Sequence, residues 1–349
     1  MRPTATMRAL TMTGFGGLEQ LAVTEVPRPA LTRPLEVLVQ LRSAALNRID
    51  LFVLRGLPKA RYDFPHVLGA DGAGVVEAVG PAVTRVRTGD RVLLNPGIAC
   101  GRCDVCLSGE QPLCREFRIL GEHLEGTLAE YVVVPEANVA PISDQLSWAE
   151  AAALPLTGLT AWRMLMTRAR VRPGETVLIW GIGGGVALAA LQIAKLAGAR
   201  VIATSSSDAK LELAGRLGAD LVLNHETGDV AAEVRRFTGG GADVVVDSVG
   251  EATWEASLRA LRPLGRLVTC GATSGPSVAL DLRRLFWFQW TLLGSTMGNH
   301  REFLEVVRLA LAGRLRPVVD SVTPLAEGPR AFARMAEGRQ LGKLVIEVA

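Results

Sequence analysis

Four closely spaced cysteines are the residues of this chain best suited to bind a metal. Cys100, Cys103, Cys106 and Cys114 follow the pattern C-x-x-C-x-x-C, then seven residues, then C. Four thiolates on one short lobe can close a tetrahedron around zinc and leave no open position for a substrate, so we expect one structural zinc ion. Two disulfides and an iron–sulfur cluster are the alternatives. The fifth cysteine, Cys270, lies in the run RLVTCGA and is expected to be a buried small hydrophobic side chain.

A second stretch, Thr176–Ala199, predicts a strand, a tight turn and a helix. It reads TVLIWGIGGGVALAALQIAKLAGA, and its first apolar residues are typical of a parallel strand covered on both faces. Apolar residues then recur at helical spacing from Val186, and Gly198 stands where a helix C-cap belongs. Free N–H groups and the helix dipole would bind a pyrophosphate at the turn. The backbone can turn sharply and approach that ligand because of four glycines: Gly181, Gly183, Gly184 and Gly185.

The turn departs from the strict G-x-G-x-x-G pattern, because Val186 stands at the third glycine position. A register through Gly184 and Ala187 reads G-x-x-G-x-x-A and keeps a small residue where the helix meets the strand. A glycine cluster by itself also fits a structural turn. The strand before it and the helix after it favour dinucleotide binding.

Length and composition predict a globular protein of two domains. The chain has 349 residues, of which 49% are hydrophobic and 21% charged, and this excludes a disordered protein. The formal net charge of +3 is spread without a basic block, so neither nucleic acid nor a membrane surface is expected as a partner. No apolar run reaches the roughly 18 residues of a membrane span, and no signal core is present, so we expect a cytoplasmic protein. Met1–Thr6 is expected to be a floppy extension.

The remaining elements fall into two groups on either side of the turn. Short alternating strands from Arg8 to about Gly89 indicate a β-rich domain, with a short helix at Asn47–Gly56. After the turn, strands and helices alternate at βαβ spacing, which predicts a doubly wound parallel sheet and hence an α/β fold. The aromatic segment Phe286–Gly298 is expected to end in an edge strand, covered either by a second copy or by its own chain.

With these motifs in place, nearly the whole chain resembles the medium-chain dehydrogenase/reductase superfamily, which includes the zinc-type alcohol dehydrogenases and the quinone oxidoreductases. Further marks are LGADGAGVVEAVG at Leu68–Gly80, GDRV at Gly89–Val92 and GTLAEYVVVP at Gly126–Pro135. The resemblance implies a GroES-like catalytic domain over 1–155 and 299–349, with the cysteine lobe at 96–118. It also implies a Rossmann dinucleotide-binding domain over 156–298.

The resemblance also implies where a catalytic zinc would bind, and this chain departs from the pattern there. Asn47 stands in place of the cysteine ligand, and Ile49 in place of the relay hydroxyl, although Arg48 and Asp50 match. Gly-Ala-Asp at 69–71 replaces Gly-His-Glu, so no histidine ligand is present. The third ligand position falls at residue 156 or 157, where neither Leu nor Thr is a zinc thiolate. Since a catalytic zinc needs three protein ligands, we expect none. His66 and His123 could rescue a site but are expected to be ordinary surface or core residues.

A chain without catalytic zinc resembles the quinone oxidoreductases, whose N-x-x-D pattern recurs in Asn47 and Asp50. We therefore expect an oxidoreductase that transfers hydride from NADPH to a quinone, an enone or another activated carbonyl compound. The expected catalytic residues are Asn47, Asp50 and Thr157, acting by positioning and by hydrogen bonds to a developing oxyanion. One alternative is a zinc-containing NAD(P)-dependent alcohol dehydrogenase. Another is a dinucleotide-binding protein without turnover.

The end of the second strand of the dinucleotide domain favours NADPH over NADH. It reads ATSSSDAK, in which Ser205 and Ser206 offer uncharged donors and Lys210 a cation for a 2′-phosphate. Asp208 is assigned as the N-cap of the next helix. Arg48 and Lys343 are candidate cations for the cofactor phosphates. The partner is expected to be a small-molecule substrate, and the protein to be a homodimer or homotetramer.

Overall fold

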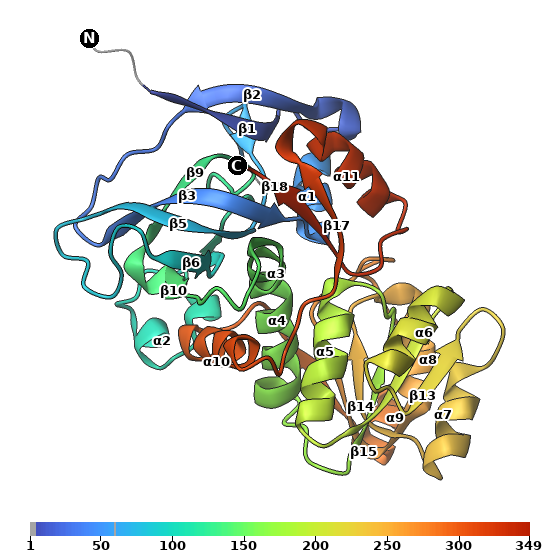
Figure 1. The fold of residues 1–349 in the computed structure, drawn as a ribbon. Coiled ribbons are helices and arrows are strands. Elements are labelled where there is room, and N and C mark those ends of the chain that lie inside the picture. Colours follow the sequence, from blue (N-terminus) through green and yellow to red (C-terminus); the bar gives the residue numbers. More distant parts are fainter. Residues whose placement is uncertain (1–4, 59–60) are drawn as a thin grey trace. The chain divides into compact units, whose positions relative to one another are not determined.

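The structure is a computed structural model that describes residues 5–58 and 61–349 (Figure 1). It divides into two compact units, one comprising Met1–Leu156 and Gly298–Ala349 and the other Thr157–Met297. The expected N-terminal extension falls largely on residues 1–4, outside the described part, and Thr6 already begins strand β1 (Thr6–Met12). Within the described residues, no helix is both long and apolar enough to cross a membrane.

The first unit is built on two sheets. In the described residues, the larger has the order β10-β6-β5-β3-β18-β17, with β9 also paired to β3, and the smaller has the order β2-β1-β4. Their remaining strands are β2 (Leu21–Pro27), β3 (Glu36–Ala45), β4 (His66–Val67), β5 (Asp71–Val79), β6 (Arg91–Leu94), β9 (Tyr131–Pro135), β10 (Val139–Pro141), β17 (Val319–Pro324) and β18 (Lys343–Glu347).

The last strand of the first unit, β18, completes its main sheet from the far end of the sequence. It lies antiparallel to β3, with Val345 opposite Ala45, and Figure 1 shows it in red beside the blue strand. The core that these strands enclose is apolar and closed to solvent, and it includes Leu41, Phe332 and Ile346, each with no exposed surface. Lys343, the first residue of β18, is thereby carried into the interior.

Helices and short turns cover these sheets. The helices are α1 (Arg48–Arg55), α2 (Asp104–Leu107), α3 (Trp148–Ala153), α10 (His300–Leu311) and α11 (Gly328–Ala336). Single helical turns lie at Leu18–Gln20, Gln111–Leu113, Glu136–Asn138 and Leu325–Glu327. A two-stranded ribbon of β7 (Gly97–Ile98) and β8 (Arg118–Ile119) flanks the cysteine lobe. The helix that leaves this unit, α4 (Pro155–Trp162), continues into a π-helical turn at Arg163–Arg168.

The second unit is a parallel sheet, as the βαβ spacing predicts. Its described strands have the order β13-β12-β11-β14-β15-β16, so the chain reverses direction across the sheet between β11 and β14. They are β11 (Thr176–Ile179), β12 (Arg200–Ser205), β13 (Leu221–Asn224), β14 (Ala242–Asp247), β15 (Leu261–Thr269) and β16 (Thr291–Gly294). The helices between them are α5 (Gly185–Leu196), α6 (Asp208–Arg216), α7 (Val230–Thr238), α8 (Glu251–Ala260) and α9 (Leu282–Trp287).

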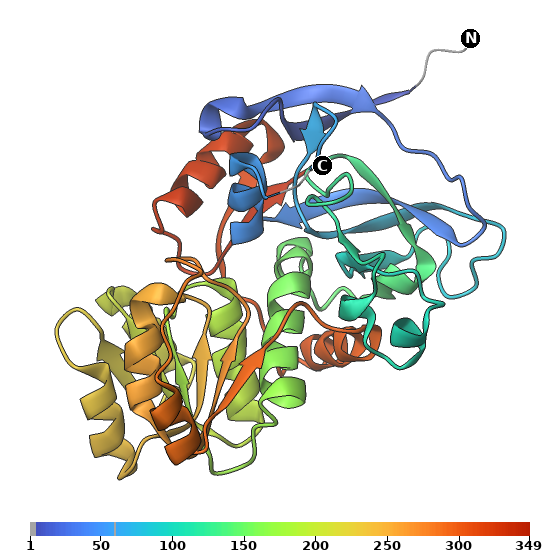
Figure 2. The ribbon, with the colours of Figure 1, turned by 180° about the vertical axis from the view of Figure 1, so that it is seen from behind.

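Strand β11, in the middle of this sheet, is buried on both faces, as its run of apolar residues predicts. Val177, Leu178 and Ile179 have no exposed surface. Figures 1 and 2 view the sheet from its two faces, with α5 in front in the first and α8 with α9 in front in the second. Strand β16 forms one edge of the sheet, as expected for the aromatic segment, and on its free side no strand of the described chain pairs with it.

Candidate functional site

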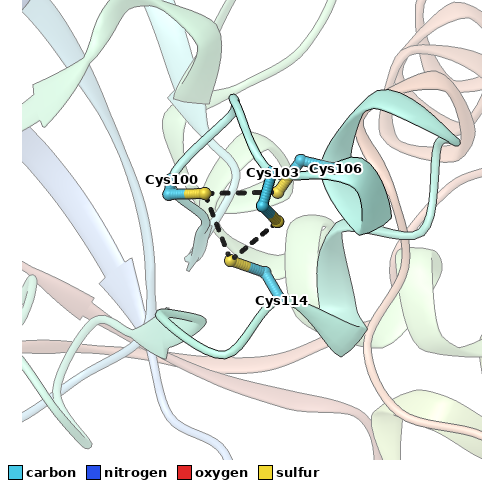
Figure 3. Close-up of side chains that lie close together, drawn as sticks. All are labelled: Cys100, Cys103, Cys106 and Cys114. Atoms are coloured by element: carbon cyan, nitrogen blue, oxygen red, sulfur yellow. Dashed lines mark hydrogen bonds between the residues drawn. The ribbon is translucent and has the colours of Figure 1, made fainter.

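The four predicted zinc ligands lie together in the lobe between β7 and β8 (Figure 3). Their sulfur atoms all lie within 4.8 Å of one another. Sγ of Cys100 is 3.8 Å from that of Cys106 and 3.5 Å from that of Cys114, and Cys103 and Cys114 are separated by 3.9 Å. Tetrahedral zinc with Zn–S bonds of ~2.3 Å separates its sulfurs by about 3.8 Å. The cluster therefore has the dimensions of a four-thiolate zinc site.

Local backbone geometry explains how so short a segment converges on one point. Gly101 and Gly109 have φ of +73° and +85°, a left-handed conformation that lets the chain reverse between ligands. Cys103 is the N-cap of α2, so its side chain stays outside the helix. The fifth cysteine, Cys270, lies outside the cluster; it is only partly buried, not fully buried as its apolar neighbours suggest.

A second group of polar side chains is buried in the first unit, and Asp71 is its centre. Oδ1 of Asp71 accepts a hydrogen bond from the backbone N–H of Leu156 at 2.8 Å. Its Oδ2 accepts from Nδ2 of Asn47 at 2.9 Å and from Nζ of Lys343 at 3.0 Å. The Asp71 side chain has no exposed surface. One carboxylate thus joins the start of α1, the start of β5, the first turn of α4 and the start of β18.

Lys343 occupies a different environment from the exposed cation that the sequence suggests. Its side chain is only 4% exposed, and its Nζ donates to Oδ1 of Asn47 at 2.6 Å as well as to Asp71. Asn47 uses its other polar atoms too, since Nδ2 donates to Asp71 and, at 3.3 Å, to the carbonyl oxygen of Ala45. Asn47, Asp71 and Lys343 therefore form a closed triangle of hydrogen bonds.

Asp50 adds a second carboxyl group beside this triangle. Its Oδ2 accepts a hydrogen bond from the backbone N–H of Asn47 at 2.7 Å. Asn47 is the N-cap of α1, so this hydrogen bond closes the start of that helix. Burial raises the pKa of Asp50 from 3.8 to about 7, an effect opposed by the Asn47 N–H and by the charge of Lys343 and assisted by Asp71. Near neutral pH this carboxyl group can therefore hold or release a proton.

These residues do not suit a catalytic zinc ion. The positions that the resemblance assigns to its ligands carry an amide at Asn47, a methyl group at Ala70 and an apolar side chain at Leu156. The first of these contacts an ammonium group, which repels a divalent cation. Among described residues, the four cysteines are the one group of three or more potential ligands that lie close together. His66 is buried and its Nε2 lies 3.1 Å from the carbonyl oxygen of Gly121, away from any such group.

The other predicted residues of the first unit lie outside the triangle. Arg48 is the first residue of α1 and is exposed at its surface. His123 is bound locally, because its Nδ1 accepts the N–H of Ile119 at 3.2 Å. Thr157 is buried in α4 and belongs to the second unit. The catalytic roles expected for Asn47, Asp50 and Thr157 stay predictions.

The glycine turn has the conformation that a phosphate site needs. Gly181 and Gly183 have φ of +68° and +119°, which disfavours other residues. Gly184 is the N-cap of α5, no side chain in the described chain caps that helix, and a Cβ at Gly184 would meet nothing within 4 Å. The first N–H groups of a twelve-residue helix are thus left for an anion. Ala187 is 5% exposed, as the register through Gly184 requires of the residue where helix meets strand.

The residues expected to select the cofactor lie beside this turn. A Cβ on Gly183 would lie 2.5 Å from Cδ of Lys210, so the lysine side chain runs across the turn. Ser205 is buried and its Oγ accepts the N–H of Ser207, whereas Ser206 is exposed. The N-cap of α6 is Ser207, and Asp208 is instead the first helical residue. The assignment of Asp208 as N-cap is wrong by one position, because the helix begins at Asp208 itself, one residue earlier than an N-cap at Asp208 implies.

Two family models match the chain. The one described as alcohol dehydrogenase GroES-like domain matches residues 33–144, and the one described as zinc-binding dehydrogenase matches residues 185–312. Together they cover most of both units.

The similarity to several other proteins extends over nearly the whole chain. An alcohol dehydrogenase of Geobacillus stearothermophilus is 34% identical, covering 94% of this chain and 96% of its own. An NAD-dependent alcohol dehydrogenase of Sulfolobus acidocaldarius is 33% identical over 98% of this chain and all of its own. A crystal structure of an NAD-dependent alcohol dehydrogenase is 48% identical, with a TM-score of 0.95 and coverage of 98% and 100%. These names favour an enzyme, and they favour the alcohol dehydrogenase alternative over quinone reduction.

Proposed function

The chain belongs to the medium-chain dehydrogenase/reductase superfamily and is a nicotinamide-dependent oxidoreductase; from that premise we propose that it reduces an activated carbonyl compound without a catalytic metal ion. The acceptor class is an enone, a quinone or another carbonyl compound whose electrophilic carbon takes up hydride readily. The observation that carries this proposal is the triangle of Asn47, Asp71 and Lys343, which puts an amide and an ammonium group where a zinc site needs anionic or imidazole ligands.

The second candidate is an alcohol dehydrogenase that binds zinc through other ligands. It is favoured by the names of the three similar proteins, each called an alcohol dehydrogenase. The side chains at positions 47, 70 and 156 oppose it. The two candidates differ in the number of zinc ions, since the cysteine lobe accounts for one and a catalytic ion would be a second.

The residues of the second unit support NADPH as the cofactor. The glycine turn and the uncapped start of α5 would hold its pyrophosphate, and Lys210 with Ser206 would hold the 2′-phosphate. The names of two similar proteins specify NAD, which supports NADH instead. We retain NADPH because the segment 205–210 offers hydroxyl groups and a cation where NAD enzymes place an acid to bind the ribose.

In this mechanism the protein positions the acceptor and stabilises charge. The bound reduced cofactor supplies the hydride. Asn47 and Asp71 fix the buried polar triangle, and Asp50, with its pKa of about 7, can hold a proton near the site at neutral pH. The four cysteines would hold a structural zinc ion, which would stabilise the lobe and take no part in the chemistry.

We also propose that two copies pair along the β16 edge. The helix that precedes β16 in the chain is α9, whose Leu282, Phe286 and Trp287 are 65%, 68% and 76% exposed. An open strand edge and exposed large apolar side chains are both features that a second copy can cover.

The test combines metal analysis with a substrate panel on the purified protein. We expect one zinc ion per chain, tighter binding of NADPH than of NADH, and reduction of enones or quinones but no oxidation of simple alcohols. Two zinc ions with turnover of alcohols would establish the second candidate. Cofactor binding without turnover of any compound in the panel would refute both.

A further inference from the structure

We propose that Lys343 is the group that stabilises negative charge on the substrate oxygen, the task that a metal ion performs in a zinc-dependent active site. This inference rests on the proposed reduction of an activated carbonyl compound. It assigns to one named side chain the electrophilic role for which the sequence suggests Asn47.

Lys343 has more hydrogen-bond donors than its protein partners use. An ammonium group has three N–H donors. Two of them are used, one by Oδ1 of Asn47 and one by Oδ2 of Asp71, and no further partner of Nζ exists among the described residues. Since the side chain is only 4% exposed, bulk water has little access to it. A buried donor without a partner is costly, and a substrate oxygen would satisfy it.

Asn47, by contrast, has no hydrogen-bond donor left for a substrate. Both hydrogens of its Nδ2 are directed to protein atoms, one to Asp71 and one to the carbonyl oxygen of Ala45. Its Oδ1 accepts from Lys343 and so holds the ammonium group in place. Asn47 and Asp71 are thus positioning residues, which fix Lys343 from two sides.

The positive charge of Lys343 disfavours a metal ion at the position of Asn47. The ammonium nitrogen lies 2.6 Å from the Asn47 side chain, at the first of the positions where a zinc ligand would stand. A divalent cation bound at that position would face a positive charge at close range, with two carboxyl groups, Asp71 and Asp50, beside it. The preformed positive charge is therefore carried by the chain itself.

The chemistry needs only a hydrogen bond from this group. When hydride and its electron pair add to the electrophilic carbon of the acceptor, the π electrons move to the carbonyl oxygen, which becomes negative. The Lys343 N–H donates a hydrogen bond to that oxygen while it carries charge, and Lys343 keeps its proton. A proton from water then completes the two-electron reduction, and the reduced cofactor is the species oxidised. Donors of this kind act most strongly where water is excluded.

The test removes both charges of the pair, because a single change at Lys343 would leave Asp71 buried and unpaired. In the double variant Lys343→Met/Asp71→Asn we expect kcat for an enone to fall by about 10²- to 10³-fold, as when one oxyanion donor is removed. The Kd of NADPH should change less than about threefold. A matched control, Lys195→Met/Asp220→Asn, removes an ion pair on the other unit and should keep the kcat of the wild type.

Several outcomes would overturn the proposal. A double variant that turns over at the wild-type rate would show that Lys343 is only structural, and a large rise in the Kd of NADPH with unchanged kcat would show that it binds cofactor phosphate. A wild type without turnover would instead refute the proposed function. If the double variant does not fold, binding of 4-nitrophenol to the wild-type complex with NADP⁺ decides. We expect the bound phenol to ionise at lower pH than in solution, and ionisation at the same or higher pH refutes the role of Lys343.

Discussion

The buried carboxyl group of Asp50 makes the stability of the first unit depend on pH. Its pKa of about 7 in the folded chain, against an ordinary 3.8, means that the folded state binds a proton over a range in which the unfolded state has lost it. Stability contributed by this group is therefore present at low pH and is lost as pH rises through 7. From the linkage relation, the loss is about 3 kcal/mol between pH 5 and pH 8.

Replacing this carboxyl group by an amide tests the size of this pH-dependent loss of stability. Asp50→Asn keeps an oxygen that can accept the Asn47 N–H but cannot ionise. We expect the free energy of unfolding of the wild type, minus that of the variant, to fall by about 3 kcal/mol from pH 5 to pH 8. The measurement is urea unfolding of both proteins at a series of pH values, so that contributions common to the two cancel.

A matched control and a refuting result complete this test. Asp281 is an exposed N-cap whose pKa is lowered by its hydrogen bonds with Arg283, so Asp281→Asn should leave the pH dependence between 5 and 8 unchanged. If wild type and Asp50→Asn run parallel over that range, Asp50 is ionised throughout, and the reasoning from its burial is wrong.

Three further predictions concern the metal, the cofactor and the assembly. Cys114→Ser should lose most of one equivalent of zinc and lower the Tm, whereas Cys270→Ser should keep the zinc; atomic absorption and thermal unfolding measure both. Lys210→Met should raise the Kd of NADPH about tenfold or more and change that of NADH less than about twofold, because it removes a charge-assisted contact; in fluorescence titrations Lys195→Met should leave both values unchanged. Trp287→Ser should convert dimers to monomers in sedimentation velocity, and a variant that stays dimeric contradicts pairing at β16.

Local patterns in the sequence predict much of this structure because local physics produces it. The strand at 176–180, the glycine turn and α5 follow from apolar runs and from residues that tolerate positive φ, as at Gly183. The cysteine lobe is equally local, since its four ligands lie within fifteen residues, from Cys100 to Cys114. In both cases, neighbours along the chain are also neighbours in space.

The polar triangle could not be predicted in this way, because its members are far apart in sequence. Lys343 and Asp71 are separated by 272 positions, and nothing in either segment names the other. Asp71 is absent from the expected site, and Lys343 is assigned to cofactor phosphate. One local signal was available for Asp71. A carboxylate at the start of the apolar strand DGAGVV needs a hydrogen-bond or ionic partner once it is buried. The sequence does not indicate that this partner is Lys343.

The pairing of Asp71 with Lys343 also sets an order of events during synthesis. At 5–20 residues per second, the ribosome needs roughly 15–55 seconds to add the 272 residues from Gly72 to Lys343. Over that time Asp71 has no counter-charge, and β3 lacks its neighbour β18. The second unit, which is continuous from Thr157 to Met297, emerges in full during the same interval. The main sheet of the first unit is therefore incomplete, and open to aggregation, during the time in which the whole second unit has already been synthesised.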